Sequence, residues 1–196
     1  MARRIEDANV SVGCPLSSSS FGYGEGEGWK HLQFHIHGFA NLGSTKNHYV
    51  ESPKFYCNGH QWQLLFYPGG FIDAAEGQVS VYLRHLSEGK VKFSSRMMLI
   101  DKFGERKRAF LLRKQDLFAN KMSGWKDVIS RSKILDESKN LLDDNGTLTF
   151  VVSIEEEPTT VFVPSNPCFK IIQEMFNDEN SADVCFEFGS TDEETP

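Results

Sequence analysis

Hydrophobic and polar positions alternate with a period of two along most of the chain after its first 28 residues. In one such run, Trp62, Leu64 and Phe66 occupy one face, and Gln63 and Leu65 occupy the other. Because successive side chains of a strand point to opposite faces, this pattern predicts an antiparallel strand that is buried on one side. The same alternation recurs in three further runs, residues 32–36, 79–84 and 147–154.

Turn signals separate these runs, among them Asn58-Gly59, Pro68-Gly69-Gly70 and Asn145-Gly146. Several short strands at this spacing predict an all-β fold, an antiparallel eight-stranded sandwich. Residues 124–129 break the alternation, and we interpret them as a short helical turn.

The two ends of the chain differ from this middle part. Residues 1–28 are rich in Ser and Gly and are expected to be disordered, because they cannot bury enough apolar surface to offset the entropy lost on ordering. Residues 157–166 are predicted to form a linker. Residues 167–196 predict a short helix and a short strand, followed by an acidic tail.

Composition limits the class of protein. Only 39% of the residues are hydrophobic, and no apolar run is long enough to span a bilayer. No apolar segment follows the first residues, which argues against a secretory signal. The four cysteines lack a C-x-x-C pair and indicate free thiols in a reducing compartment, so we expect a cytoplasmic or nuclear protein without membrane contact.

The net charge of −6 is unevenly distributed. Residues 96–133 carry eleven Lys or Arg against four Asp or Glu. Such a segment could attract an acidic partner, or it could consist of ordinary solvated strands and turns. An acidic overall charge and the lack of a recognised motif argue against nucleic-acid binding.

Candidate catalytic and metal-binding chemistry is weak. His31, His35 and His37 share one face of a predicted strand, but no cysteine or carboxylate stands at chelating distance in the sequence, and polar alternation explains the same spacing. None of the cysteines has the surroundings of an activated nucleophile. The sequence therefore predicts no enzyme, no metal and no cofactor.

Three motifs follow one another in a fixed order: Phe34-x-Ile36-x-x-Phe39, Tyr49-x-x-Ser52-Pro53-x-Phe55, and Gly59-x-x-Trp62-x-Leu64-x-x-Tyr67-Pro68-x-Gly70. Together with Val79-Ser80-Val81-Tyr82-Leu83 and Gly124-Trp125, this set resembles a MATH domain (meprin and TRAF-C homology) over residues 29–156. The resemblance implies a TRAF-like sandwich that binds short extended peptides of partner proteins on the exposed face of one sheet.

The resemblance implies five peptide-binding positions in this chain: Tyr82, Lys121, Gly124, Trp125 and Lys126. Strand alternation independently turns Tyr82 outward, and it also turns Leu65 outward, which makes Leu65 a sixth candidate. Both residues could instead form a cross-strand pair that supports the sheet. The speckle-type members of this family carry an arginine where Leu65 stands, so the bound motif is expected to differ from theirs.

Residues 167–196 resemble the incomplete start of a BTB/POZ domain, through Met175-Phe176 and Ser181-Ala182-Asp183-Val184-Cys185-Phe186. MATH followed by BTB is the layout of the speckle-type POZ proteins. The resemblance implies a substrate-recognition adaptor of a cullin-RING ubiquitin ligase, with a cullin as partner only if a complete BTB domain exists. For this chain we expect a monomer. The alternative is a structural or regulatory docking fragment that recognises no substrate.

Overall fold

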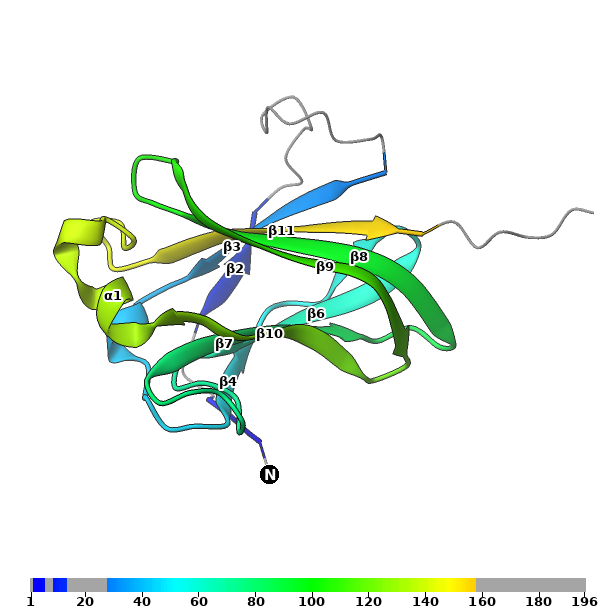
Figure 1. Ribbon diagram of the computed structural model, residues 1–196, viewed down its shortest axis with the longest axis horizontal. Coiled ribbons are helices and arrows are strands. Elements are labelled where there is room, and N and C mark those ends of the chain that lie inside the picture. The colour runs from blue at the N-terminus through cyan, green and yellow to red at the C-terminus, as the bar shows by residue number, and fades with distance from the viewer. Residues whose placement is uncertain (1, 6–8, 14–27, 158–196) are drawn as a thin grey trace, which may run out of the picture. The chain divides into compact units, whose positions relative to one another are not determined.

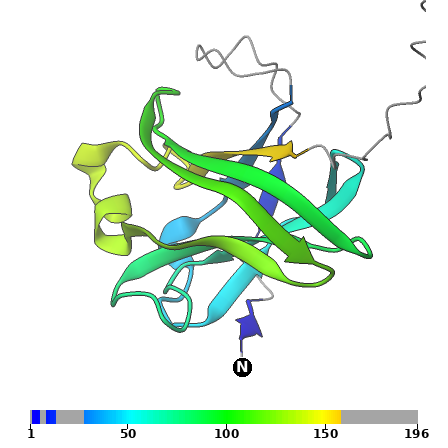
Figure 2. The same cartoon turned by 45° about the vertical axis from the view of Figure 1, so that its right-hand side comes forward.

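The computed structural model describes residues 2–5, 9–13 and 28–157, whose strands form two sheets. Figure 1 shows the sheets facing each other as the two layers of a sandwich, and Figure 2 shows the same layers after a rotation. The first sheet contains β1 (Arg3–Arg4), β4 (His48–Glu51), β5 (Phe55–Cys57), β6 (His60–Tyr67), β7 (Gln78–His85) and β10 (Met122–Ser130). The second sheet contains β2 (Val10–Val12), β3 (Lys30–Ile36), β8 (Lys90–Ile100), β9 (Arg106–Phe118) and β11 (Leu148–Glu156).

Helical structure is sparse in the described residues. It comprises α1 (Arg131–Leu135), which lies at one end of the sandwich in Figure 1, and two 3-10 helices, Phe39–Asn41 and Glu137–Lys139. No helix in this part of the chain has the length and apolar character needed to cross a membrane. The predicted all-β sandwich is confirmed.

The order of the strands places β10 at one edge of the first sheet and β11 in the middle of the second. The first sheet runs β1-β4-β6-β7-β10, with β5 paired to β6 outside this path. The second runs β2-β3-β11-β8-β9, so β11 pairs with both β3 and β8. Among the described residues, β2 and β9 are the two edge strands of the second sheet.

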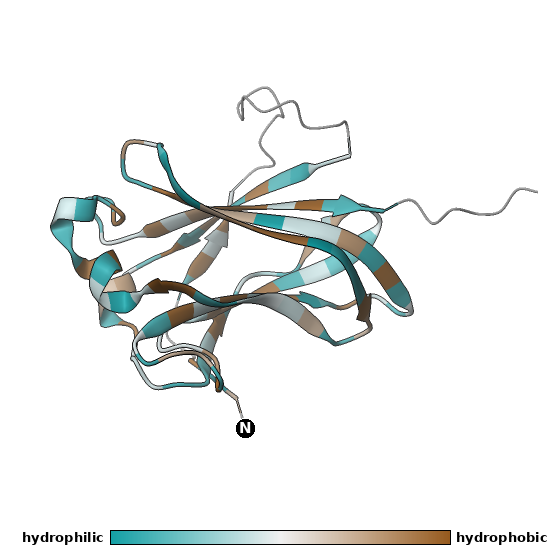
Figure 3. Cartoon of the chain, viewed as in Figure 1, coloured by the Kyte–Doolittle hydropathy of each residue, from teal (hydrophilic) through white to brown (hydrophobic). Residues whose placement is uncertain are grey.

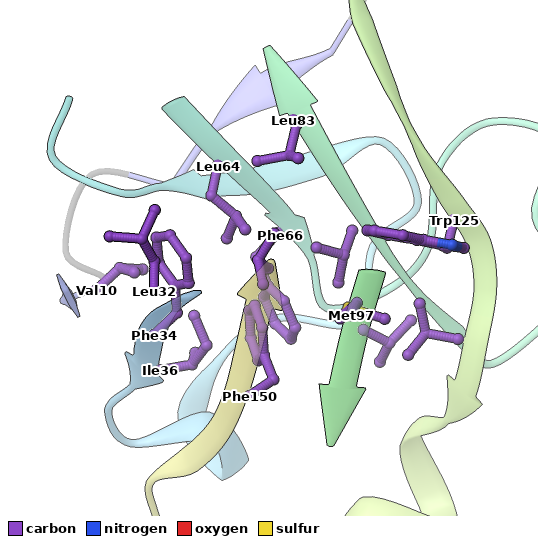
Figure 4. Close-up of a cluster of buried hydrophobic side chains, with 14 of the residues drawn as sticks. Val10, Leu32, Phe34, Ile36, Leu64, Phe66, Leu83, Met97, Trp125 and Phe150 are labelled. Atoms are coloured by element: carbon purple, nitrogen blue, oxygen red, sulfur yellow. The ribbon is translucent and has the colours of Figure 1, made fainter. Parts of the chain in front are cut away.

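The core lies between the two sheets and is rich in aromatic side chains. The ring of Phe150 stacks against Phe34 and Phe66 at centroid distances of 5.8 and 6.0 Å, and Trp62 packs on Phe93 at 5.0 Å. Figure 4 shows part of this cluster, with side chains reaching inward from both sheets. Burial of each such side chain contributes about 1.5–3 kcal/mol, so the aromatic core is a main source of the stability of the sandwich.

The alternation assigned the core faces correctly. Trp62, Leu64 and Phe66 are all buried in the core, whereas their neighbours Gln63 and Leu65 are not part of it. Eight of the described strands have four or more residues, as expected, and β1, β2 and β5 are additional strands of two or three residues.

Two local expectations were wrong. Residues 124–129 form no helical turn; they belong to β10, which pairs antiparallel with β7. Disorder was expected throughout residues 1–28, but β1 pairs with β4 and β2 pairs with β3. The burial of Val10 beside Ile36 supplies the apolar contact that offsets the ordering of this segment.

Contacts divide the chain into two units, Met1–Pro158 and Thr159–Pro196. The second unit lies outside the described residues. The predicted linker beyond Glu157 and the BTB-like residues 167–196, with their expected helix and strand, therefore also lie outside them.

Candidate functional site

The candidate site lies on the face of the first sheet that points away from the core, here called the outer face. On β7, Val81 and Leu83 belong to the core, so alternation places Tyr82 on the outer face. Tyr82 stands between Leu65 of β6 and Gly124 of β10 in the strand register. The predicted outward direction of Tyr82 is therefore confirmed, and its side chain is partly exposed.

Four aromatic residues gather on the outer face and are here called the aromatic cluster: Tyr49, Tyr67, Phe71 and Tyr82. The ring of Tyr82 lies 5.8 Å from Tyr67 and 5.1 Å from Phe71, measured between centroids. Tyr67 also packs on Tyr49 at 5.5 Å and on Phe71 at 5.2 Å. Tyr67 is buried, whereas the other three remain partly exposed and form an apolar surface with phenol groups at its rim.

The loop between β6 and β7 brings Phe71 to this cluster. The backbone N–H of Phe71 donates to Ser80 Oγ at 2.8 Å, and that of Ala75 donates to Asp127 Oδ1 at 2.8 Å. The Ser80 hydroxyl in turn donates to the carbonyl of Lys126. These bonds tie the loop to β7 and β10, so Phe71 has a fixed position beside Tyr82.

The phenols of Tyr67 and Tyr82 stay neutral at physiological pH. Burial, together with smaller contributions from the carboxylates of Asp73 and Asp127, raises the pKa of Tyr82 to about 12. Burial likewise raises the pKa of Tyr67 to about 12. Each hydroxyl can therefore donate a hydrogen bond, and that of Tyr67 points to Met122 Sδ at 3.9 Å.

Only glycine fits at position 124, because the surrounding atoms leave no room for a side chain. A Cβ atom at this position would lie 2.1 Å from the carbonyl oxygen of Val81 and 2.5 Å from Tyr82 Cα. Both are backbone atoms, which cannot move aside without disturbing the pairing of β10 with β7. The outer face therefore has no side chain next to the Tyr82 ring on the edge strand.

The two candidate lysines lie near β10 and are exposed. Lys126 belongs to β10, and its Nζ lies 4.0 Å from Oδ2 of Asp73, which stands in the loop that carries Phe71. This is a weak surface ion pair. Lys121 precedes β10 in a tight turn, where its carbonyl oxygen accepts a hydrogen bond from the backbone N–H of His85. Lys126 therefore borders the aromatic cluster, whereas Lys121 lies at the end of the strand.

Two of the six sequence candidates are not available at the surface. Leu65 points to the outer face, as predicted, but it is 0% exposed, so the expectation of an exposed apolar residue was wrong. Neighbouring strands cover it, with Glu51 and Tyr82 paired on either side. Trp125 is 8% exposed and belongs to the core, where Figure 4 shows it reaching inward from β10. Leu65 and Trp125 thus support the site from within.

The three histidines of β3 and its end make cross-strand hydrogen bonds. His31 Nδ1 lies 2.7 Å from Ser153 Oγ, and His35 Nδ1 lies 3.0 Å from Thr149 Oγ1. In the described part of the chain, no three His, Cys, Asp or Glu side chains are placed to hold a metal ion. Burial raises the pKa of the Cys57 thiol to about 11, so this described cysteine is protonated and unreactive at neutral pH.

Sequence reasoning did not include Tyr49, Phe71 or Arg84 among the candidate site residues, although alternation along residues 79–84 already turned Arg84 away from the core. The Arg84 guanidinium lies 6.0 Å from the centre of the Tyr49 ring. Its parity with Tyr82 along β7 was a usable signal. Phe71 lies in a loop, where alternation does not apply, so only the fold could bring it to Tyr82.

Comparison with known proteins adds a family assignment. A family model described as MATH domain matches residues 31–154. No curated protein matches the chain. Among solved structures, 41 chains match; one of them is TRAF5 of Notothenia coriiceps, at 11% sequence identity and a TM-score of 0.44. That alignment covers 56% of this chain and 62% of the TRAF5 chain, so this chain spans less than two thirds of its structural relative.

Proposed function

The chain belongs to the MATH domain family, and from this premise we propose that the outer face of its first sheet binds an extended peptide of a partner protein. MATH domains are protein-interaction modules. The observation that carries the proposal is the pairing of a partly exposed Tyr82 with a side-chain-free Gly124 on the edge strand β10.

An edge strand offers unpaired backbone N–H and C=O groups to a second chain. Since β10 ends the strand order of the first sheet, a peptide can add alongside it and form main-chain hydrogen bonds. Alternate side chains of the peptide would then point to the outer face, where Gly124 places no side chain between them and the Tyr82 ring.

The surrounding residues supply specificity. Tyr82 and Phe71 offer an apolar contact, and the Tyr82 hydroxyl offers a hydrogen-bond donor at its rim. Lys126 contributes a positive charge, and Asp73 a negative one, on the same side of the cluster. Lys121 extends the positive charge to the end of β10. A short peptide held in this way typically binds with about −5 to −8 kcal/mol, roughly 100 to 1 μM.

Leu65 and Trp125 have supporting roles in this proposal. Leu65 fills the space beneath the outer face beside Tyr82, and Trp125 fixes β10 to the core. Neither residue would touch the peptide, although both determine where Tyr82 and Gly124 lie.

The proposal extends to a biological role. We place the chain as a substrate-recognition adaptor of a cullin-RING ubiquitin ligase, acting in the cytoplasm or nucleus and without enzymatic activity of its own. The resemblance of residues 167–196 to the start of a BTB/POZ domain supports this role. A cullin would be a partner only of a chain with a complete BTB domain, and the present chain is expected to be a monomer.

A peptide-array screen, followed by titration of the best peptides in solution, tests the binding site. Tyr82→Ala and Lys126→Glu should weaken every bound peptide, whereas Tyr56→Ala should not. Tyr56 is a matched control because it is 75% exposed and pairs with Gln61 on the far side of β6 from β7. Absence of any bound peptide for the unmodified protein would favour a docking fragment without substrate recognition.

A further inference from the structure

A second concave surface lies on the opposite side of the sandwich. A cavity of about 670 Å³ opens on the outward face of the second sheet, over β8 and β9. Alternation identifies the face: Met97 and Leu99 of β8 belong to the core, whereas the intervening Arg96 and Met98 line the cavity. Cavities of roughly this size are typical of ligand sites.

Positive charge dominates this cavity, here called the basic cleft. Six basic residues line it, against the two carboxylates of Glu155 and Glu157. Five of the six belong to β9, whose hydrophilic segments appear in teal in Figure 3. The basic residues are Arg96, Arg106, Lys107, Arg108, Arg113 and Lys114.

The floor of the basic cleft is apolar. Met98 and Leu111 line it, and Leu111 is 41% exposed. Met98 also packs with Ile100 and Val151 in a small buried cluster that is separate from the main core. A basic rim over an apolar floor suits a ligand that carries both carboxylates and apolar groups.

A β-bulge in β9 shapes the cleft. The register with β8 shifts between Phe93 and Ser95, and Lys114 adopts a left-handed backbone with φ 51°. Its backbone N–H donates to Ser94 Oγ at 3.2 Å in place of a regular ladder bond. Bulges re-aim side chains, and a non-glycine residue in this conformation carries strain that the surrounding structure must hold. Arg113 and Lys114, both exposed, are the side chains that this bulge sets at the rim.

Part of the positive charge already has contacts within the domain. Lys107 Nζ lies 2.9 Å from Asp101 Oδ2 and 2.7 Å from Glu105 Oε2. Arg108 lies 4.8 Å from the centre of the Phe110 ring. Even with Glu155 and Glu157 counted, basic groups exceed acidic groups along the cleft, so its net field is positive.

We infer that the basic cleft binds an extended acidic segment of a partner protein, whose carboxylates meet Arg113 and Lys114 and whose apolar side chains meet Leu111 and Met98. Charge complementarity identifies this partner. A nucleic acid fits less well, because the apolar floor of Leu111 and Met98 offers its phosphates no partner, and Trp29, which could stack a base, is already covered by Arg96 at 5.0 Å. The cleft and the aromatic cluster lie on different sheets, so the two sites are independent.

The probe is a fluorescein-labelled peptide of alternating Glu and Leu, titrated by fluorescence anisotropy at low salt. We expect binding in the range of about 1–100 μM that weakens as salt is added. The double variant Arg113→Glu with Lys114→Glu should weaken it by about tenfold or more. Lys133→Glu, an exposed change on α1 outside the cleft, makes one charge reversal without altering the site and should leave binding unchanged.

Three results would overturn the inference. One is equal binding of an alternating Lys and Leu peptide. Another is a single-stranded oligonucleotide that binds more tightly than the acidic peptide and loses its binding in the double variant. The third is unchanged binding in a double variant that retains the urea midpoint of the parent. Tyr82→Ala separates this test from the proposed function, because it should leave binding of the acidic peptide intact.

Discussion

Gly124 lies directly opposite Tyr82 in the register of β10 and β7, and a Cβ atom on Gly124 would come within 3.0 Å of Tyr82 Cδ1. The aromatic ring therefore takes the space that a side chain on the edge strand would need. The same missing side chain leaves the backbone of β10 open beside the ring. One glycine thus serves both the packing of the first sheet and access to Tyr82.

Gly124→Ala should destabilise the domain by about 1–3 kcal/mol, because the added methyl group meets backbone atoms on β7. Urea denaturation followed by tryptophan fluorescence measures the change. Gly43→Ala is the matched control: its Cβ would meet nothing within 4 Å, so stability should stay the same or rise slightly. Equal midpoints for the two variants would show that β10 can shift to accept the methyl group.

Leu65→Ala should lower the free energy of unfolding by about 2–5 kcal/mol, because Leu65 is fully buried on the outer face. Leu111→Ala makes the same chemical change on a partly exposed strand position and should stay within about 0.5 kcal/mol of the parent. The two denaturation midpoints give the comparison directly. A small effect of Leu65→Ala would mean that the neighbouring side chains can move into the space that the leucine leaves.

Trp125→Phe should act on stability and spare peptide binding. The indole belongs to the core, and its Nε1 has no hydrogen-bond partner in the structure, so the residue contributes by packing against the opposite sheet. Binding of a peptide on the outer face should change by less than about 0.5 kcal/mol. A large loss of affinity, with little loss of stability, would indicate that Trp125 contacts the peptide directly.

Lowering the pH below neutrality should destabilise the fold through its buried histidines. His85 is 0% exposed; burial, followed by the nearby His60 ring, lowers its pKa from the ordinary value of 6.5. The unfolded chain therefore binds the proton more readily than the folded one, so stability is fully present above pH 6.5 and declines as the pH falls toward the lowered folded-state pKa. Burial also lowers the pKa of His31 and His35, which adds to the same trend.

Urea midpoints measured between pH 8 and pH 5 check this slope. His85→Gln removes one titrating group and should flatten the curve, even if it lowers stability at every pH. If the urea midpoint of the parent protein stayed constant across this range, the lowered pKa values of the buried histidines would be contradicted.

Strand alternation predicted the layers well, because it depends only on the geometry of an extended chain. It identified the core positions of β6, β7 and β11 and turned Tyr82 outward. It could not show what covers an outward residue, so Leu65 was taken as exposed although Glu51 and Tyr82 flank it. The position of Phe71 depends on hydrogen bonds from its loop to β7, which no periodicity encodes.

The error at residues 124–129 has a specific cause. Trp125, Val128 and Ile129 all face the core, and this spacing of three and four residues is that of a helix. In the structure, a β-bulge between Trp125 and Ile129 resets the strand alternation and produces the same spacing. The N-terminal strands were missed for a simpler reason: β1 and β2 have two and three residues, too few to show a period.

The position of β11 sets the order in which the domain can fold. β11 is the last described strand in the chain, yet it separates β3 from β8, and the bond between His31 and Ser153 joins residues 122 positions apart. During synthesis, the edges of β3 and β8 that β11 joins must therefore stay unpaired until β11 has left the ribosome. Contacts of this range slow folding to roughly milliseconds to seconds, a delay that stopped-flow refolding can time and during which chaperones can hold the nascent chain.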